Sequence, residues 1–112
     1  MIAILLDDNS FEQDIRELLM AFYPGETFTH EEESAGEARV IVRGKRTGKD
    51  REWLELSAQE NREDSPLTFA SICPDFSNRF EAKNEIKRSM YGMLRSLTGK
   101  ELPWGTLTGI RP

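Results

Sequence analysis

The chain has 112 residues, of which 38% are hydrophobic and 31% are charged, and its formal net charge is −5. These values fit one globular domain with a single core, and they exclude a disordered tail. No run of residues approaches the ~20 apolar positions that a membrane helix needs, and the start lacks the basic segment of a secretory signal, so we expect a cytoplasmic protein without a membrane partner.

The first part of the sequence predicts a strand, a helix and a second strand. The apolar run 1–6 contains β-branched residues and stops at Asp7 and Asp8, which is typical of a short strand followed by a turn. Ser10 and Gln13 have the spacing of a capping box at a helix start. Apolar residues then recur at helical spacing: Phe11, Ile15, Leu18, Leu19 and Phe22. Pro24-Gly25 ends this helix, and Thr27 to Thr29 favour a strand.

The middle of the chain predicts a hairpin and one further strand. In the segment 38–46, Val40 and Val42 lie on one face of a strand and Arg39, Ile41 and Arg43 on the other, and a similar alternation follows in the segment 52–59. The turn sequence Thr47-Gly48-Lys49-Asp50 joins the two segments. Residues 67–73 favour a last edge strand that Pro74 closes.

A second helix is predicted from Asn78 to Thr98, with Asn78 at its start and Gly99 as its cap. Its apolar face consists of Ile86, Met90, Met93, Leu94 and Leu97. Two helices with one apolar stripe each pack together on one face of a sheet. The sequence therefore predicts an α+β fold, a two-layer sandwich with a mainly antiparallel sheet of four to five strands and two helices packed on one face. The order of the strands does not follow from the sequence.

The candidate reactive groups do not form a catalytic or metal site. Asp7 and Asp8 are adjacent on an extended chain, so their side chains point to opposite faces, and we interpret them as charged residues ahead of a helix. Cys73 is the single cysteine and His30 the single histidine, which is too few for an ordinary zinc site. No serine lies in a nucleophile elbow, and no glycine-rich phosphate loop is present. We expect no catalytic residue, no metal and no cofactor in this chain.

Charge is distributed unevenly along the chain. Residues 79–112 hold seven Lys or Arg and three Glu, a net charge of +4, whereas residues 1–78 carry −9. Lys83, Lys87, Arg88 and Tyr91 of the second helix are the candidate contacts for an anion or a partner. Because the remaining surface repels phosphate, we interpret the helix as a solvated face and expect no nucleic-acid partner. A nucleic-acid- or protein-binding module remains the alternative function.

The closing segment 102–112 differs from the rest of the chain. It combines a tryptophan, two glycines, two prolines and aliphatic residues within eleven positions. Trp104, Leu107 and Ile110 form an apolar patch, which we expect further polypeptide to cover. The alternative is that this segment folds back on the domain's own sheet.

The same segment carries a resemblance to a known family. Three stretches, Lys87-Arg-Ser-Met-Tyr-Gly-Met-Leu94, Thr98-Gly-Lys100 and Trp104-Gly-Thr-Leu-Thr-Gly-Ile-Arg-Pro112, resemble the junction that ends the amino-terminal region of oxygen-independent coproporphyrinogen III oxidase-like radical S-adenosylmethionine proteins, also called coproporphyrinogen dehydrogenases. The resemblance is specific over residues 83–112 and concerns only the order of strands and helices over residues 1–82.

The resemblance implies a parent oxidoreductase of porphyrin and heme biosynthesis. Residues 1–100 would be its amino-terminal accessory domain and residues 101–112 the junction to a radical S-adenosylmethionine domain, its partner in cis. The resemblance further implies that this downstream domain binds a 4Fe–4S cluster and S-adenosylmethionine, and that Trp104, Leu107, Ile110 and Arg111 dock on it. A further expectation is that Lys83 and Lys87 steer the carboxylate-rich substrate by their charge.

Overall fold

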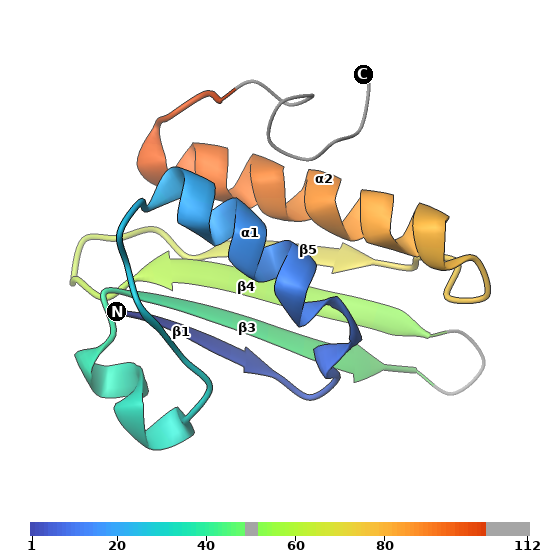
Figure 1. Ribbon diagram of the computed structural model, residues 1–112, viewed down its shortest axis with the longest axis horizontal. Coiled ribbons are helices and arrows are strands. Elements are labelled where there is room, and N and C mark those ends of the chain that lie inside the picture. The colour runs from blue at the N-terminus through green and yellow to red at the C-terminus, as the bar shows by residue number, and fades with distance from the viewer. Residues whose placement is uncertain (49–51, 103–112) are drawn as a thin grey trace.

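The structure of the chain is a computed structural model, and it describes residues 1–48 and 52–102. Its two long helices lie together on one side of a sheet, as Figure 1 shows. The elements in chain order are β1 (Ile2–Leu6), the 3-10 helix η1 (Asn9–Phe11), α1 (Glu12–Phe22), β2 (Phe28–Thr29), the 3-10 helix η2 (Glu32–Glu37), β3 (Val40–Thr47), β4 (Trp53–Glu60), β5 (Thr68–Ile72) and α2 (Arg79–Thr98). The predicted α+β sandwich with two helices on one face is confirmed.

The sheet is mixed, which corrects the prediction of a mainly antiparallel one. Its five strands lie in the order β2-β1-β3-β4-β5. β1 pairs in parallel with both β2 and β3, whereas β3, β4 and β5 are successive antiparallel neighbours. The parallel pairs arise because the chain passes through α1 between β1 and β2 and through η2 between β2 and β3. Parallel neighbours need such crossover connections, whereas a tight turn joins an antiparallel hairpin.

The two crossovers use opposite faces of the sheet. α1 lies on one face, over β1 and against α2. η2 lies on the other face, where Ala35 packs with Ala3 and Ala38 in a small cluster. Because β2 and β3 flank β1 on opposite sides, two connections of the same hand must pass over opposite faces. The face under α1 and α2 is called the covered face below, and the other is called the open face.

The main core fills the space between the covered face and the helices. Every second residue of the strands points into it, so Val40, Val42, Leu56 and Ala58 are fully buried. The helices contribute the residues that the sequence pattern identifies, among them Phe22, which is also fully buried. Burying large aliphatic and aromatic side chains contributes about 1.5–3 kcal/mol each. This packing accounts for most of the stability that holds the helices on the sheet.

Gly44 occupies a position on the covered face where any larger residue would displace a neighbouring leucine side chain. A Cβ atom there would lie 2.6 Å from Cδ2 of Leu6 on β1 and 3.2 Å from Cδ2 of Leu56 on β4. The leucines from both neighbouring strands therefore fill the space above this residue. The glycine lets β1, β3 and β4 pack closely at this end of the sheet.

The ends of the helices confirm two predicted caps and correct a third. The Asn78 side chain accepts a hydrogen bond from the amide of Glu81, 3.2 Å away, and Gly99 has a φ of 72°, the left-handed cap expected of glycine. The predicted capping box of Ser10 and Gln13 is absent from this described segment, because Ser10 lies inside η1. Asp8 accepts the Ser10 amide hydrogen bond instead.

Candidate functional site

The predicted docking residues Trp104, Leu107, Ile110 and Arg111 lie outside the described residues. The structure does describe the last residues of the domain, Gly99 and Lys100, and the first two of the junction, Glu101 and Leu102, which together we call the chain exit. The chain exit is therefore the described segment that leads to the predicted docking residues, and its position and contacts are given next.

Contacts with both helices hold the chain exit in place. The Lys100 ammonium donates a hydrogen bond to the carbonyl oxygen of Phe22 at the end of α1, 2.9 Å away. The Tyr91 hydroxyl on α2 donates to the carbonyl oxygen of Leu102. The Leu102 side chain is half-buried and packs against the main core. The chain thus leaves α2 in a direction that three separate contacts fix.

Lys83 and Lys87 lie beside α1 rather than on an outward face of α2. Their ammonium nitrogens lie 3.4 Å and 3.7 Å from the Asp14 carboxylate on α1. Lys87 is 5% exposed and Asp14 is 8% exposed, so both are buried between the helices. The two lysines are four positions apart and share one flank of α2. Their charges hold the helices together, a role that the sequence pattern did not indicate.

Tyr91 and Arg88 differ from each other in exposure. The Tyr91 ring packs edge-on against Phe22, with ring centroids 5.7 Å apart and planes at 66°. Arg88 is exposed. The four predicted contact residues of α2 therefore do not form one outward patch, because two of them face Asp14 and a third packs on α1.

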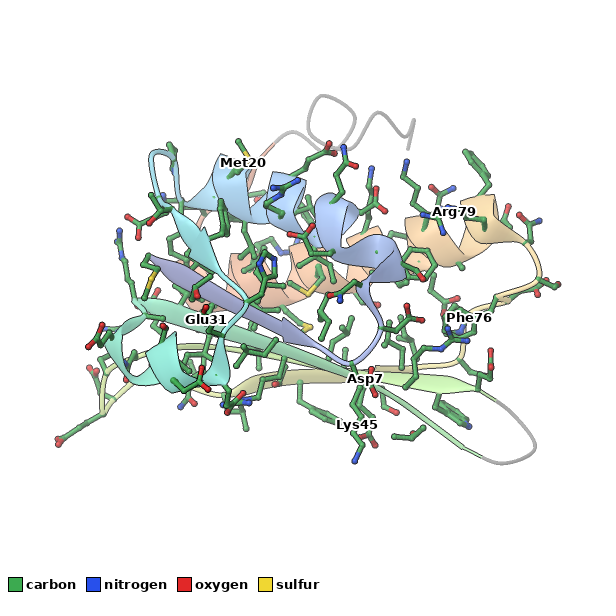
Figure 2. The ribbon with its side chains drawn as sticks, turned by 60° about the horizontal axis from the view of Figure 1, so that its bottom comes forward. Asp7, Met20, Glu31, Lys45, Phe76 and Arg79 are labelled. Atoms are coloured by element: carbon green, nitrogen blue, oxygen red, sulfur yellow. The ribbon has the colours of Figure 1, made fainter. Side chains whose placement is uncertain are left out.

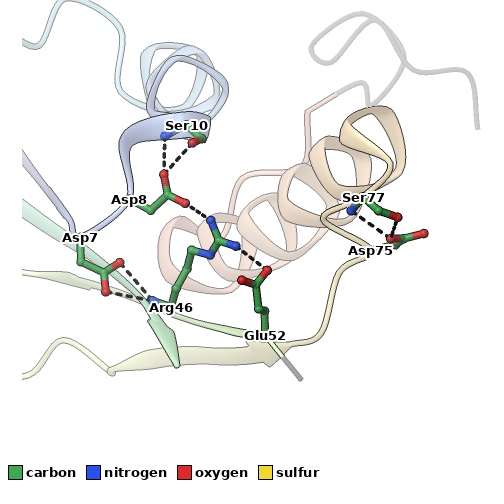
Figure 3. Close-up of polar contacts among 7 residues, drawn as sticks. All are labelled: Asp7, Asp8, Ser10, Arg46, Glu52, Asp75 and Ser77. Carbon is green, nitrogen blue, oxygen red and sulfur yellow. Dashed lines mark hydrogen bonds and ion pairs between the residues drawn. The ribbon is translucent and has the colours of Figure 1, made fainter. Parts of the chain in front are cut away.

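Asp7 and Asp8 join the end of β1 to the end of β3. Both carboxylate oxygens of Asp7 accept from the backbone amide of Arg46, at 3.0 and 3.1 Å. The Asp8 carboxylate forms an ion pair with the Arg46 guanidinium, which also lies 2.5 Å from the Glu52 carboxylate. Figure 3 shows these hydrogen bonds and ion pairs. The Arg46 guanidinium also stacks 4.0 Å from the centroid of the Phe76 ring. The sequence could not indicate this cluster, because Asp8 and Arg46 are 38 positions apart.

The contacts of this cluster lower the pKa of the Asp8 carboxylate. Its oxygen accepts from both the hydroxyl and the amide of Ser10, at 2.6 and 3.0 Å. The hydrogen bond from the Ser10 hydroxyl, followed by the one from Arg46, lowers the pKa of Asp8 to about 2. A carboxylate that stays ionised in this way stabilises the turn between β1 and α1 and is a poor proton donor.

The open face carries a shallow hollow of about 520 Å³. Its lining includes Leu5, Arg43, Lys45, Ser57 and Phe69. In Figure 2, Lys45 points away from the sheet on the side opposite the helices. The Arg43 guanidinium pairs with the Glu32 carboxylate on η2, 2.9 Å away. Carboxylates and cations both line the hollow, so its charge does not select one class of ligand.

The remaining candidate groups stay separate from one another. His30 contacts the Glu12 carboxylate through Nε2 at 3.0 Å, and Cys73 is half-buried next to Pro74. Within residues 1–48 and 52–102, no three His, Cys, Asp or Glu side chains are grouped to hold a metal ion. An iron–sulfur cluster needs several thiolates, and the sequence has one cysteine, so this chain does not fit such a cluster by itself.

None of the helices in the described part of the chain has the length and apolar character needed to cross a bilayer.

The chain was compared with known proteins. No protein-family model, no curated protein and no solved structure matches it.

Proposed function

We propose that this chain is a non-catalytic accessory and docking domain of a radical S-adenosylmethionine oxidoreductase that resembles oxygen-independent coproporphyrinogen III oxidase. The observation that carries the proposal is the closing stretch from Trp104 to Pro112, together with the preceding stretches of α2. The oxidation chemistry, the iron–sulfur cluster and S-adenosylmethionine belong to the downstream domain. This chain contributes a folded support that orients that domain.

The geometry of the chain exit supports this role. A domain can hold its neighbour in a fixed orientation only if the segment between them is held rigidly, because domains joined by a flexible segment move relative to one another. Here Lys100 is bonded to the end of α1, and Leu102 is held by Tyr91 on α2. Both helices of the sandwich therefore contact the chain exit. In the proposal, Trp104, Leu107, Ile110 and Arg111 then contact the downstream domain.

The alternative of a nucleic-acid-binding module receives less support from the structure. Lys83 and Lys87 lie against Asp14, which offsets part of their charge. Binding of phosphates requires lysines whose ammonium groups can reach the nucleic acid and release its counterions. Arg88 is exposed, but the net charge of −5 on the chain opposes the approach of a phosphate backbone.

The first test reads the gene beyond the codon for Pro112. The proposal expects the reading frame to continue and to encode the cysteine spacing Cys-x-x-x-Cys-x-x-Cys in a downstream domain. A reading frame that ends at Pro112, or that continues without cluster ligands, overturns the proposed function.

The second test measures docking in the protein encoded by that whole reading frame. The change Trp104→Ala should increase proteolysis at the junction and lower the oxidoreductase activity, because truncation of a buried aromatic anchor costs about 2 kcal/mol or more. The matched control is Trp53→Ala, the chain's other tryptophan, which lies on β4 with 39% of its surface exposed. Equal behaviour of the two variants would contradict a docking role for Trp104.

A further inference from the structure

β5 is the outer strand at one end of the sheet, and nothing in its sequence protects that edge. Among the described residues its strand partner is β4 alone. Natural edge strands are usually kept from pairing by a charge, a proline, a bulge or short length. The five residues Thr68-Phe-Ala-Ser-Ile72 include no charge and no proline, and they pair with β4 in an unbroken register. The opposite edge, β2, has only two residues and is thus protected by its shortness.

Exposed apolar side chains gather at the same edge. Leu67, directly before β5, is 62% exposed, and Phe69 within β5 is 60% exposed. Apolar groups that gather on a surface indicate a contact site for another protein surface.

The helix above this edge has a flank of small residues. α2 packs over β4 and β5, and Lys83, Lys87 and Tyr91 mark the flank that faces α1. Ser89, Gly92 and Ser96 follow at i, i+3 and i+7, on the opposite flank, which lies on the β5 side and also carries Glu85 one turn before Ser89. A Cβ atom built on Gly92 meets no atom within 4 Å, so the space beside it is open. Small residues allow another helix to approach closely.

We propose that β5 pairs antiparallel with β5 of a second copy of this chain, which joins the two sheets into one and brings the two α2 helices side by side. A two-fold axis through Ala70 places Thr68 opposite the partner's Ile72 and Phe69 opposite the partner's Ser71. This register keeps Ala70 and Ile72, which pack on the main core, on the helix side in both copies. No like charges oppose each other across the strand pair.

A second copy fits this edge better than an unrelated extended peptide. A peptide would pair with β5 but would leave the small-residue flank of α2 uncovered. A second copy covers β5 and this flank together, because each copy supplies the same two elements to a symmetric interface. The inference rests on β5 and α2 and does not depend on the proposed function.

The test measures the mass of the 112-residue chain by sedimentation velocity over a range of concentrations. We expect a concentration-dependent dimer. The double variant F69K/S71K places lysines opposite lysines across the two-fold axis and should raise the dimer dissociation constant about tenfold or more. The control S57K adds a lysine to the open face of β4, an inner strand, and should leave the dimer unchanged.

A charge-swap variant separates pairing at β5 from pairing elsewhere. The variant F69E/S71E should also be monomeric alone, and its mixture with F69K/S71K should form a heterodimer, since each lysine then faces a glutamate. A monomeric wild-type chain at every concentration overturns the proposal, and so does a dimer that all the variants retain. Should a variant fail to fold, amide hydrogen exchange in the wild type decides. Protection of residues 68–72 that does not increase as the dimer forms would also overturn the proposal.

Discussion

The two faces of the sheet consist of alternate residues of the same strands, yet they have different properties. On the covered face, Val42 and Leu56 are fully buried beneath the helices. On the open face, their strand neighbours Arg43 and Ser57 line a shallow hollow that contains charges of both signs. One face therefore supplies the stability of the domain, whereas the other face and the β5 edge remain available for contacts with other molecules.

The largest expected difference between the faces comes from two adjacent residues of β4. Leu56→Ala removes a fully buried side chain and should lower the free energy of unfolding by about 2–5 kcal/mol, through lost burial and the cavity that remains. Ser57→Ala, on the open face, should change it by no more than about 0.5 kcal/mol. Urea unfolding followed by circular dichroism measures both. Similar losses at the two sites would contradict the division of roles between the faces.

The assignment of residues to the covered face is the part of the fold that the sequence predicted well. Period-two alternation in β3 and β4 placed Val40, Val42 and Leu56 correctly, because each strand has one face against the core. Helical spacing identified Phe22 and the apolar face of α2 for the same reason. Asn78 and Gly99 were also predicted as the ends of α2, because caps depend on residues within one turn.

The parallel half of the sheet could not be predicted, because its pairing is not local. β2 consists of Phe28 and Thr29, too short a strand for its pattern to identify a partner. The polar contacts of the site have the same origin. Arg46 reaches Asp8 from β3, and Lys87 reaches Asp14 from the other helix, so each pair depends on tertiary packing. The roles predicted for Trp104 to Arg111 stay predictions, since these residues lie outside the described part of the chain.

A smaller effect is expected at Asp8, which joins the start of η1 to β3 at the end of the sheet. Asp8→Asn weakens the ion pair with Arg46 and the hydrogen bonds from Ser10, and should cost about 1–2 kcal/mol at neutral pH. The folded pKa of Asp8, about 2, is below the ordinary value of 3.8. Its contribution is therefore complete above pH ~4 and is lost as the pH falls through the folded pKa. Unfolding of wild type and variant measured from pH 7 to pH 2 should converge at the acid end.

Asp64→Asn is the matched control for this change. Asp64 is an aspartate with 80% of its side chain exposed, and its partner Arg62 is 3.6 Å away. Exposed pairs of this kind contribute little to stability, so this variant should follow the wild type at every pH. A difference between wild type and Asp8→Asn that persists unchanged to pH 2 would show that the carboxylate charge is not what stabilises this turn.

The smallest expected effect concerns two arginines of β3 that lie on different sides of the sheet. Arg43 on the open face pairs with Glu32, and their side chains are 49% and 66% exposed. Arg46 is 30% exposed, pairs with Asp8 and stacks on Phe76. At ~1 M salt the screening length falls to about 3 Å, so any destabilisation by Arg43→Met should disappear in salt. That of Arg46→Met should largely persist, because salt screens the partly buried ion pair with Asp8 and the close stacking on Phe76 much less. If Arg43→Met lowers the free energy of unfolding equally with and without salt, the open face also contributes to the stability of the fold.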